Sequence, residues 1–233
     1  MTLNRSLTLA AIAASLFVTP SLSHAQRGPG GMGNFYLEGA FTPILQGANE
    51  SIQTGGGSFP GEGNPGTDST TGYDVRTTLG YAIGGQYFVG LSYRMMSSTL
   101  KREGTISGEF PVSSTEYGPT LGYLYGGWKI MATYILSSEW KKGFKETLQD
   151  GSLGSNYDIK NHDGNGFMVN VGYNFSITSW LQLGPSLIYR NVSYAKQTKT
   201  NKLDESQSYT DKAFDTKAMQ SDLSPYFTII ARF

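Results

Sequence analysis

The sequence contains no cysteine, so disulfide bonds cannot hold its fold together. Charged residues make up only 15% of the chain, with 18 basic and 18 acidic side chains and just two histidines. This zero net charge argues against a nucleic-acid partner, which requires a basic surface. After the N-terminal segment, the chain also lacks any apolar run of about 20 residues, the length that a membrane-spanning helix needs. We are left with a soluble exported β protein or a membrane β-barrel.

The N-terminal segment has the features of a secretory signal peptide. Arg5 precedes an apolar stretch from residue 7 to residue 18, and Ser23-His24-Ala25 fits the pattern of a cleavage site. We therefore expect three parts: a signal peptide at residues 1–25, a short periplasmic lead-in at 26–33 and the folded domain at 34–233. His162 is then the one histidine of the mature protein.

Apolar and polar residues alternate along eight segments, and helical periodicity is absent. Each segment has about 9 to 13 residues, which suits a tilted strand that crosses a bilayer. The segments lie within residues 34–43, 73–83, 87–95, 116–125, 128–136, 167–175, 181–190 and 223–233. This pattern predicts eight membrane-spanning strands.

The connections between these segments are short and long in turn. Residues 84–86, 126–127 and 176–180 form tight turns, whereas the long, polar connections are about 46–72, 97–115, 137–166 and 191–222. Four long loops on one side, with tight turns and both termini on the other, are typical of outer-membrane barrels. We expect the long loops to be extracellular and the termini periplasmic. The last long connection is expected to extend its two strands as a hairpin.

The two faces of the strands differ in charge. One face carries essentially no charge, and the other holds Glu38, Asp74, Arg76, Arg94, Glu116, Lys129 and Arg190. A soluble β-sandwich would turn its charges to water, so the uncharged face is assigned to lipid and the charges to an enclosed interior. Interfacial aromatics are expected beside the tight turns: Tyr81, Tyr87, Tyr125, Trp128, Tyr173 and Phe175. We predict an all-β fold, a closed, antiparallel, eight-stranded, up-and-down transmembrane β-barrel.

Three prolines fall inside the expected strands, where each removes a hydrogen-bond donor from the sheet. They are Pro119, Pro185 and Pro225. A barrel without edges then requires a bulge or local water at these positions.

The last strand ends on an aromatic residue, with apolar residues at alternating positions before it: Leu223, Phe227, Ile229 and Phe233. In this respect the chain resembles the small, eight-stranded outer-membrane β-barrel family that includes OmpX, OmpW and the membrane domain of OmpA. The resemblance implies that these four residues are the signal read by the outer-membrane assembly machinery. The chain departs from the family pattern at Ala231, where an aromatic is more usual, and at Pro225.

Three groups of residues are candidate sites. The interior charges form either a plug of salt bridges or a path for protons or small solutes, and we favour the plug. Asn161, Asp163 and Asn165 have the spacing of the first half of a calcium loop, but the glutamate that completes it is missing. His162 and Asp163 form the one conceivable acid–base pair, with no nucleophile motif. We predict no catalytic residue, metal or cofactor.

The sequence therefore favours a non-enzymatic, monomeric outer-membrane protein of a Gram-negative bacterium, with a structural or adhesive role of its surface loops. The alternative is a narrow channel or binding barrel for a small apolar or ionic solute, and a lipid hydrolase or acyltransferase at the rim is a third possibility. The expected partners are outer-membrane lipids, the assembly machinery and lipopolysaccharide, whose phosphates Lys196, Lys199 and Lys202 would meet.

Overall fold

The computed structural model describes residues 35–47, 67–103, 107–148 and 152–233. The predicted signal peptide, the lead-in and most of the first long connection, residues 48–66, lie outside these ranges. Within the described ranges, no helix is long and apolar enough to cross a membrane.

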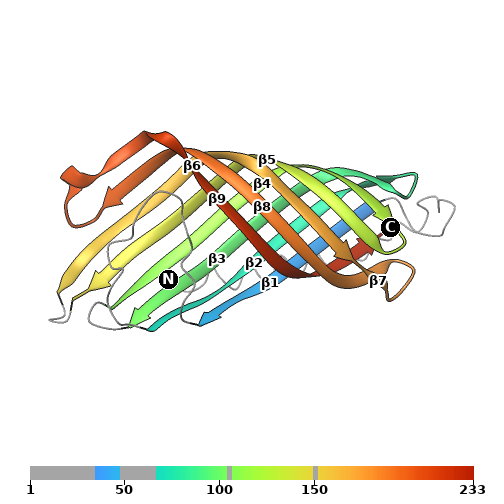
Figure 1. Cartoon of the computed structure of the whole chain (residues 1–233), viewed down its shortest axis with the longest axis horizontal. Coiled ribbons are helices and arrows are strands. Elements are labelled where there is room, and N and C mark those ends of the chain that lie inside the picture. Colours follow the sequence, from blue (N-terminus) through green and yellow to red (C-terminus); the bar gives the residue numbers. More distant parts are fainter. Residues whose placement is uncertain (1–34, 48–66, 104–106, 149–151) are drawn as a thin grey trace.

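Eight long antiparallel strands form a closed ring, seen from the side in Figure 1. The strands are β1 (Phe35–Gly47), β2 (Thr67–Ile83), β3 (Tyr87–Glu103), β4 (Ser107–Tyr125), β5 (Trp128–Thr147), β6 (Leu153–Tyr173), β8 (Leu181–Asn201) and β9 (Tyr209–Arg232). Each pairs with its neighbour in the sequence, β6 pairs with β8, and β9 returns to β1. The two-residue strand β7 (Phe175–Ser176) and the 3-10 helix η1 (Glu205–Gln207) lie in connections. The predicted eight-stranded barrel is confirmed.

Glycine residues allow two tight turns to form between neighbouring strands. Gly84 and Gly85 have φ angles of 61° and 73°, and Gly126 and Gly127 have φ angles of 57° and 90°. Side chains with a Cβ rarely adopt these values, whereas glycine adopts them at little cost. These turns lie at one end of the barrel together with Phe35 and Phe233, and we call this the turn end.

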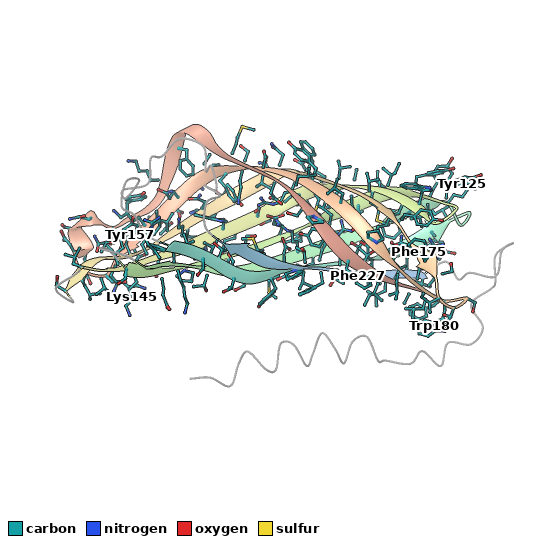
Figure 2. All side chains as sticks on the ribbon, turned by 60° about the horizontal axis from the view of Figure 1, so that its bottom comes forward. Tyr125, Lys145, Tyr157, Phe175, Trp180 and Phe227 are labelled. Carbon is teal, nitrogen blue, oxygen red and sulfur yellow. The ribbon has the colours of Figure 1, made fainter. Side chains whose placement is uncertain are left out.

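The strands extend well beyond the predicted segments toward the other end, which we call the hairpin end. Much of the connections predicted at 97–115, 137–166 and 191–222 is strand in the structure: β3–β4, β5–β6 and β8–β9 continue as hairpins. The hairpin expected at 191–222 is present, and the other two predicted loops are corrected to hairpins. Figure 2 shows Lys145 and Tyr157 at the hairpin end, far from Tyr125, Phe175 and Trp180.

An apolar belt surrounds the outside of the barrel at the turn end. Most of its outward side chains are large, apolar and exposed: Tyr73, Leu79, Tyr81 and Ile83 along β2, and Trp128, Ile130, Tyr134 and Leu136 along β5. Eight to ten residue steps of about 3.3 Å, at the tilt of about 40° that barrel strands adopt, give a height of about 20–25 Å. This matches the apolar band of a transmembrane barrel.

Above the belt, the polarity of the two faces is reversed. Outward residues there are charged or polar, such as Lys101, Glu109 and Lys141, while Phe110 and Trp140 are buried inside. A register shift in β5 between Ile135 and Ser138 exchanges the inward and outward positions at this boundary. The hairpin end therefore has the residue pattern of a water-soluble barrel, with polar side chains outside and apolar ones inside, whereas the belt has the pattern of a barrel in lipid.

One junction of the ring is short. β1 pairs with β9 only from Tyr36 to Phe41, opposite Arg232 to Phe227, and a reciprocal backbone pair joins Phe35 to Phe233. Toward the hairpin end the two strands separate, as Figure 1 shows. We call this place the β1–β9 seam.

The prolines lie where the strand pairing is interrupted. Pro119 lies at the register shift between β4 and β5, and Pro185 lies between the β6–β8 and β7–β8 ladders. Pro225 and Pro43 lie just beyond the last paired residues of the β1–β9 seam. A proline has no N–H, so it removes a donor that would otherwise be left without a partner.

Candidate functional site

Glu38 of β1 is the centre of a fully buried polar cluster, which we call the lower network. Its carboxylate pairs with Arg76 of β2 and, across the barrel, with Lys129 of β5 at 2.7 Å. Tyr36 Oη donates to Glu38 Oε2 at 2.5 Å, and Asn170 Nδ2 donates to Oε1 at 3.2 Å. One carboxylate thus receives donors from four strands.

A second cluster, the upper network, lies nearer the hairpin end. Arg94 pairs with Asp74 and with Glu116, whose Oε1 is 3.3 Å from Nη1. Arg190 pairs with the same Glu116 and, at 2.9 Å, with Asp222. Ion pairs therefore connect β2, β3, β4, β8 and β9 around the interior.

Two further layers fill the interior. Four hydroxyl groups on adjacent strands form a continuous chain, in which Thr78, Ser92, Thr120 and Thr133 are 2.9, 2.7 and 2.8 Å apart in turn. At the turn end, a buried apolar layer consists of Tyr36, Ala82, Phe88, Leu124, Met131 and Ile230. Packed side chains thus fill the described interior beside the two networks.

All seven inward charges proposed from the sequence are at most 4% exposed, and they take part in these two networks. Sequence reasoning missed Asp222, which it placed at the end of a loop. Alternation in β9 would have found it, since Asp222 has the same phase as Ser224 and the buried Tyr226. Tyr36 and Asn170 were missed because uncharged inward residues carry no distinctive sequence signal.

Aromatic and cationic side chains gather inside the hairpin end. Phe144 stacks on Tyr157 with ring centroids 4.4 Å apart and meets Phe110 edge-on at 5.7 Å. Lys142 Nζ lies 4.7 Å from the Phe144 ring centroid, and Lys199 Nζ lies 4.8 Å from that of Tyr157. Burial and, to a smaller extent, the charge of Arg102 together lower the pKa of Lys142 to about 8.

Lys142→Met is expected to stabilise the barrel at pH 7. The folded-state pKa of Lys142 is about 8, below the unfolded value of about 10.4. Below pH 8 the charge on Lys142 therefore lowers the free energy of unfolding. Wild-type stability therefore rises between pH 8 and about 10.4, and this rise disappears in the variant. Since the Lys142–Phe144 contact is partly favourable, we expect a gain of about 1–2 kcal/mol at pH 7.

The measurement is urea unfolding in detergent micelles from pH 7 to pH 10. Lys141→Met is the matched control, because Lys141 is the adjacent lysine on the outer face and is 56% exposed. A pH slope of stability that is equal in wild type and Lys142→Met would show that Lys142 keeps its charge on folding.

His162 connects three strands at the hairpin end. Its Nε2 lies 3.0 Å from Asp211 Oδ1 and 3.3 Å from Thr198 Oγ1, and its Nδ1 lies 3.4 Å from Asp163 Oδ1. The Thr198 hydroxyl donates to Asp211 Oδ1 at 3.4 Å and accepts from the Asp211 backbone N–H at 3.2 Å. The one hydroxyl that contacts the imidazole is therefore engaged with Asp211, which favours a structural link over an activated nucleophile.

The three residues with calcium-loop spacing lie within β6 and not in a loop. Asn161 Oδ1 accepts from Gln197 Nε2 at 2.9 Å, and Asp163 Oδ2 pairs with Lys196 at 2.8 Å. Asn165 is in register with Ser193 of β8. The hydrogen bond from Lys196 lowers the pKa of Asp163. Among the described residues, no group of three or more His, Cys, Asp or Glu side chains could hold a metal ion.

The predicted interfacial aromatics lie at the turn end of the apolar belt. Trp128 meets Tyr173 at 5.1 Å, and Tyr173 meets Phe175 at 4.9 Å. Tyr81, Tyr87 and Tyr125 are 40%, 63% and 64% exposed. In β9, Leu223, Phe227 and Ile229 point outward, and Phe233 is joined to Phe35 by two backbone hydrogen bonds.

A closed ring with an apolar belt outside and charged networks inside defines a transmembrane β-barrel. No protein-family model and no curated protein matches the chain. Similar solved structures are small outer-membrane barrels. Neisserial surface protein A is 15% identical, with a TM-score of 0.39 over 85% of this chain and 97% of that one. Ail of Yersinia pestis is 10% identical, with a TM-score of 0.40 over 86% and 98%.

The outer-membrane protease OmpT of Escherichia coli is 10% identical, with a TM-score of 0.43 over 87% of this chain and 94% of that chain. These neighbours differ in the roles that their names state, from surface protein to protease. The assignment of the fold therefore rests on the strand pairing and residue faces of this chain.

Proposed function

We propose that this chain is a monomeric, non-enzymatic protein of the Gram-negative outer membrane that acts at the cell surface through its hairpin end. The observation that carries this proposal is the reversal of face polarity above the apolar belt. Charged outward residues such as Lys141 and Lys145 require water on the outside, while the belt below requires lipid.

The length of the hairpins supports a role in contact with other molecules. Strands β4, β5, β6, β8 and β9 have 19, 20, 21, 21 and 24 residues, whereas about 9–11 residues are enough to cross a bilayer. The remaining half of each strand forms a rigid platform outside the belt. Such a platform suits adhesion or recognition, and its lysines suit contact with lipopolysaccharide phosphates.

The filled interior argues for a closed barrel. The lower network, the hydroxyl chain and the upper network occupy the described interior, and their central members Glu38, Thr120 and Glu116 are at most 1% exposed. A transport path along the axis would have to break ion pairs that are out of contact with water.

The alternative is a barrel that binds a small solute, and the β1–β9 seam favours it. Above Phe41 and Phe227 the two strands do not pair, and Asp222 beside the seam is 28% exposed. A solute could then pass through the side of the barrel. Discrete openings in planar bilayers, or a solute bound behind the seam, would favour this alternative over the proposed surface role.

Single cysteines test the orientation, since the native chain has none. Lys145→Cys at the hairpin end is expected to react with a membrane-impermeant maleimide on intact Gram-negative cells. Gln86→Cys in a tight turn is expected to react only after lysis, because the turn would face the periplasm. The opposite pattern, or labelling of both, would contradict the proposed orientation.

The surface role is tested by shortening the last hairpin. Replacing residues 200–208 with Asn-Gly removes its tip, including η1, and leaves the belt intact. Cells that display this variant are expected to adhere less well to immobilised extracellular-matrix proteins than cells displaying wild type at equal surface levels. Equal adhesion after each of the three hairpins has been shortened in turn would contradict a role in adhesion.

A further inference from the structure

The lower network holds more positive than negative charge. Glu38 is its one carboxylate, and Arg76 and Lys129 are its two cations. Their side chains are 0% exposed, so the excess charge of one is out of contact with water. An uncompensated buried charge costs several kcal/mol, which gives this cluster a reason to hold a counter-ion.

Glu38 has no further capacity to receive donors. Its Oε1 accepts from Arg76 and Asn170, and its Oε2 accepts from Tyr36 and Lys129. Arg76 uses only Nη2 in this pairing, and its Nε and Nη1 are buried without a hydrogen-bond partner. A buried guanidinium with free N–H groups, close to an ammonium, attracts an anion.

The surrounding charges do not neutralise this excess. The upper network has three carboxylates and two arginines, and its most exposed member, Asp222 at 28%, lies at the seam, where water can solvate it. From the turn end, the Arg232 guanidinium lies 5.7 Å from the Tyr36 ring centroid and adds to the positive potential. On β2, Arg76 is two residues from Asp74 and lies opposite Arg94 of β3, but Asp74 and Arg94 pair with each other.

We propose that the barrel binds one small monovalent inorganic anion, such as chloride, at a free N–H group of Arg76, either Nε or Nη1, within the field of Lys129. Water would satisfy these N–H groups but would leave the charge unbalanced. The anion neutralises the cluster and accepts a hydrogen bond from one of the free N–H groups of Arg76. It would thus be a structural ion of the barrel wall, and this site is independent of the surface role proposed above.

Bromide is the direct probe. Crystals of protein refolded in sodium bromide are expected to show one anomalous peak within about 3.5 Å of Arg76 Nε or Nη1. Electron density at the same place without an anomalous signal would identify a water molecule and overturn the proposal.

Stability gives a second readout. Protein refolded in chloride is expected to unfold a few degrees higher than protein refolded in gluconate at equal ionic strength, because an ion that binds only the folded state stabilises it. Lys129→Met makes the cluster neutral, so this difference is expected to disappear. Lys101→Met, at an exposed lysine on the outer face, is the control and is expected to keep it.

Equal unfolding temperatures of wild type in the two salts would overturn the proposal and would indicate that Lys129 is neutral in the folded barrel. The proposal would also be overturned if Lys129→Met kept the full difference in unfolding temperature between chloride and gluconate. If Lys129→Met does not fold, the bromide experiment on the wild type decides.

Discussion

Glu38→Ala is expected to lower the free energy of unfolding by about 3–5 kcal/mol, the cost of leaving one side of a buried ion pair without its partner. In this variant, Arg76 and Lys129 keep their charges in a space that is 0% exposed, and the hydrogen bonds from Tyr36 and Asn170 are lost as well. The loss is large relative to the 5–15 kcal/mol that stabilise a typical native protein. Urea unfolding in detergent micelles, followed by tryptophan fluorescence, measures it.

Glu139→Ala is the matched control for this experiment. Glu139 also pairs with two cations, Lys141 and Lys160, each at 2.7 Å, but its side chain is 32% exposed and lies above the apolar belt. Water screens exposed pairs, so we expect a loss of at most about 1 kcal/mol. Similar losses in the two variants would mean that the lower network is hydrated and that burial does not set its strength.

The alternation of residues was sufficient to predict the belt but not the length of the strands. In residues 128–136 the outward positions are apolar, as a lipid-facing strand requires. Beyond Leu136 the register shift in β5 exchanges the two faces, so the inward Trp140 and Phe144 have the opposite phase to the inward Met131. A bulge leaves no signature in the sequence, and the change in phase made a continuous strand look like a loop.

The choice of partners within the networks depends on how the ring closes. The sequence indicates that Glu38 and Lys129 both point inward, but they are 91 residues apart and on non-adjacent strands. Whether they meet depends on the stagger of the strands around the barrel, which the pattern of a single strand does not contain. Arg94 and Glu116, by contrast, lie opposite each other on the adjacent strands β3 and β4, so their contact follows from the pairing of two neighbouring strands.

The prolines, too, were predictable from the sequence only in part. Their positions inside predicted strands indicated interruptions of the ladder, and Pro119 does lie at a register shift. That Pro43 and Pro225 lie at the same junction follows only from the pairing of the first strand with the last. Contacts between the ends of a chain are the hardest to predict from local pattern.

Deleting Phe233 is expected to weaken closure of the barrel. The β1–β9 seam has six residue pairs, against 17 between β2 and β3. Phe233 adds two backbone hydrogen bonds to this short seam: its N–H donates to Phe35 O at 3.0 Å, and Phe35 N–H donates to Phe233 O at 3.1 Å. At about 1 kcal/mol for each hydrogen bond, we expect a loss of roughly 2 kcal/mol together with faster unfolding.

Phe233→Ala separates this effect from recognition by the assembly machinery, because it keeps both backbone hydrogen bonds and removes only the ring. If the terminal aromatic is an assembly signal, as the family resemblance implies, Phe233→Ala folds in detergent nearly as well as wild type but accumulates poorly in the outer membrane of cells. The deletion is impaired in both settings. The readout is the fraction of protein that migrates as the folded form on a gel without boiling. Normal accumulation of Phe233→Ala in cells would remove the terminal ring from the assembly signal and leave closure of the seam as the role of this residue.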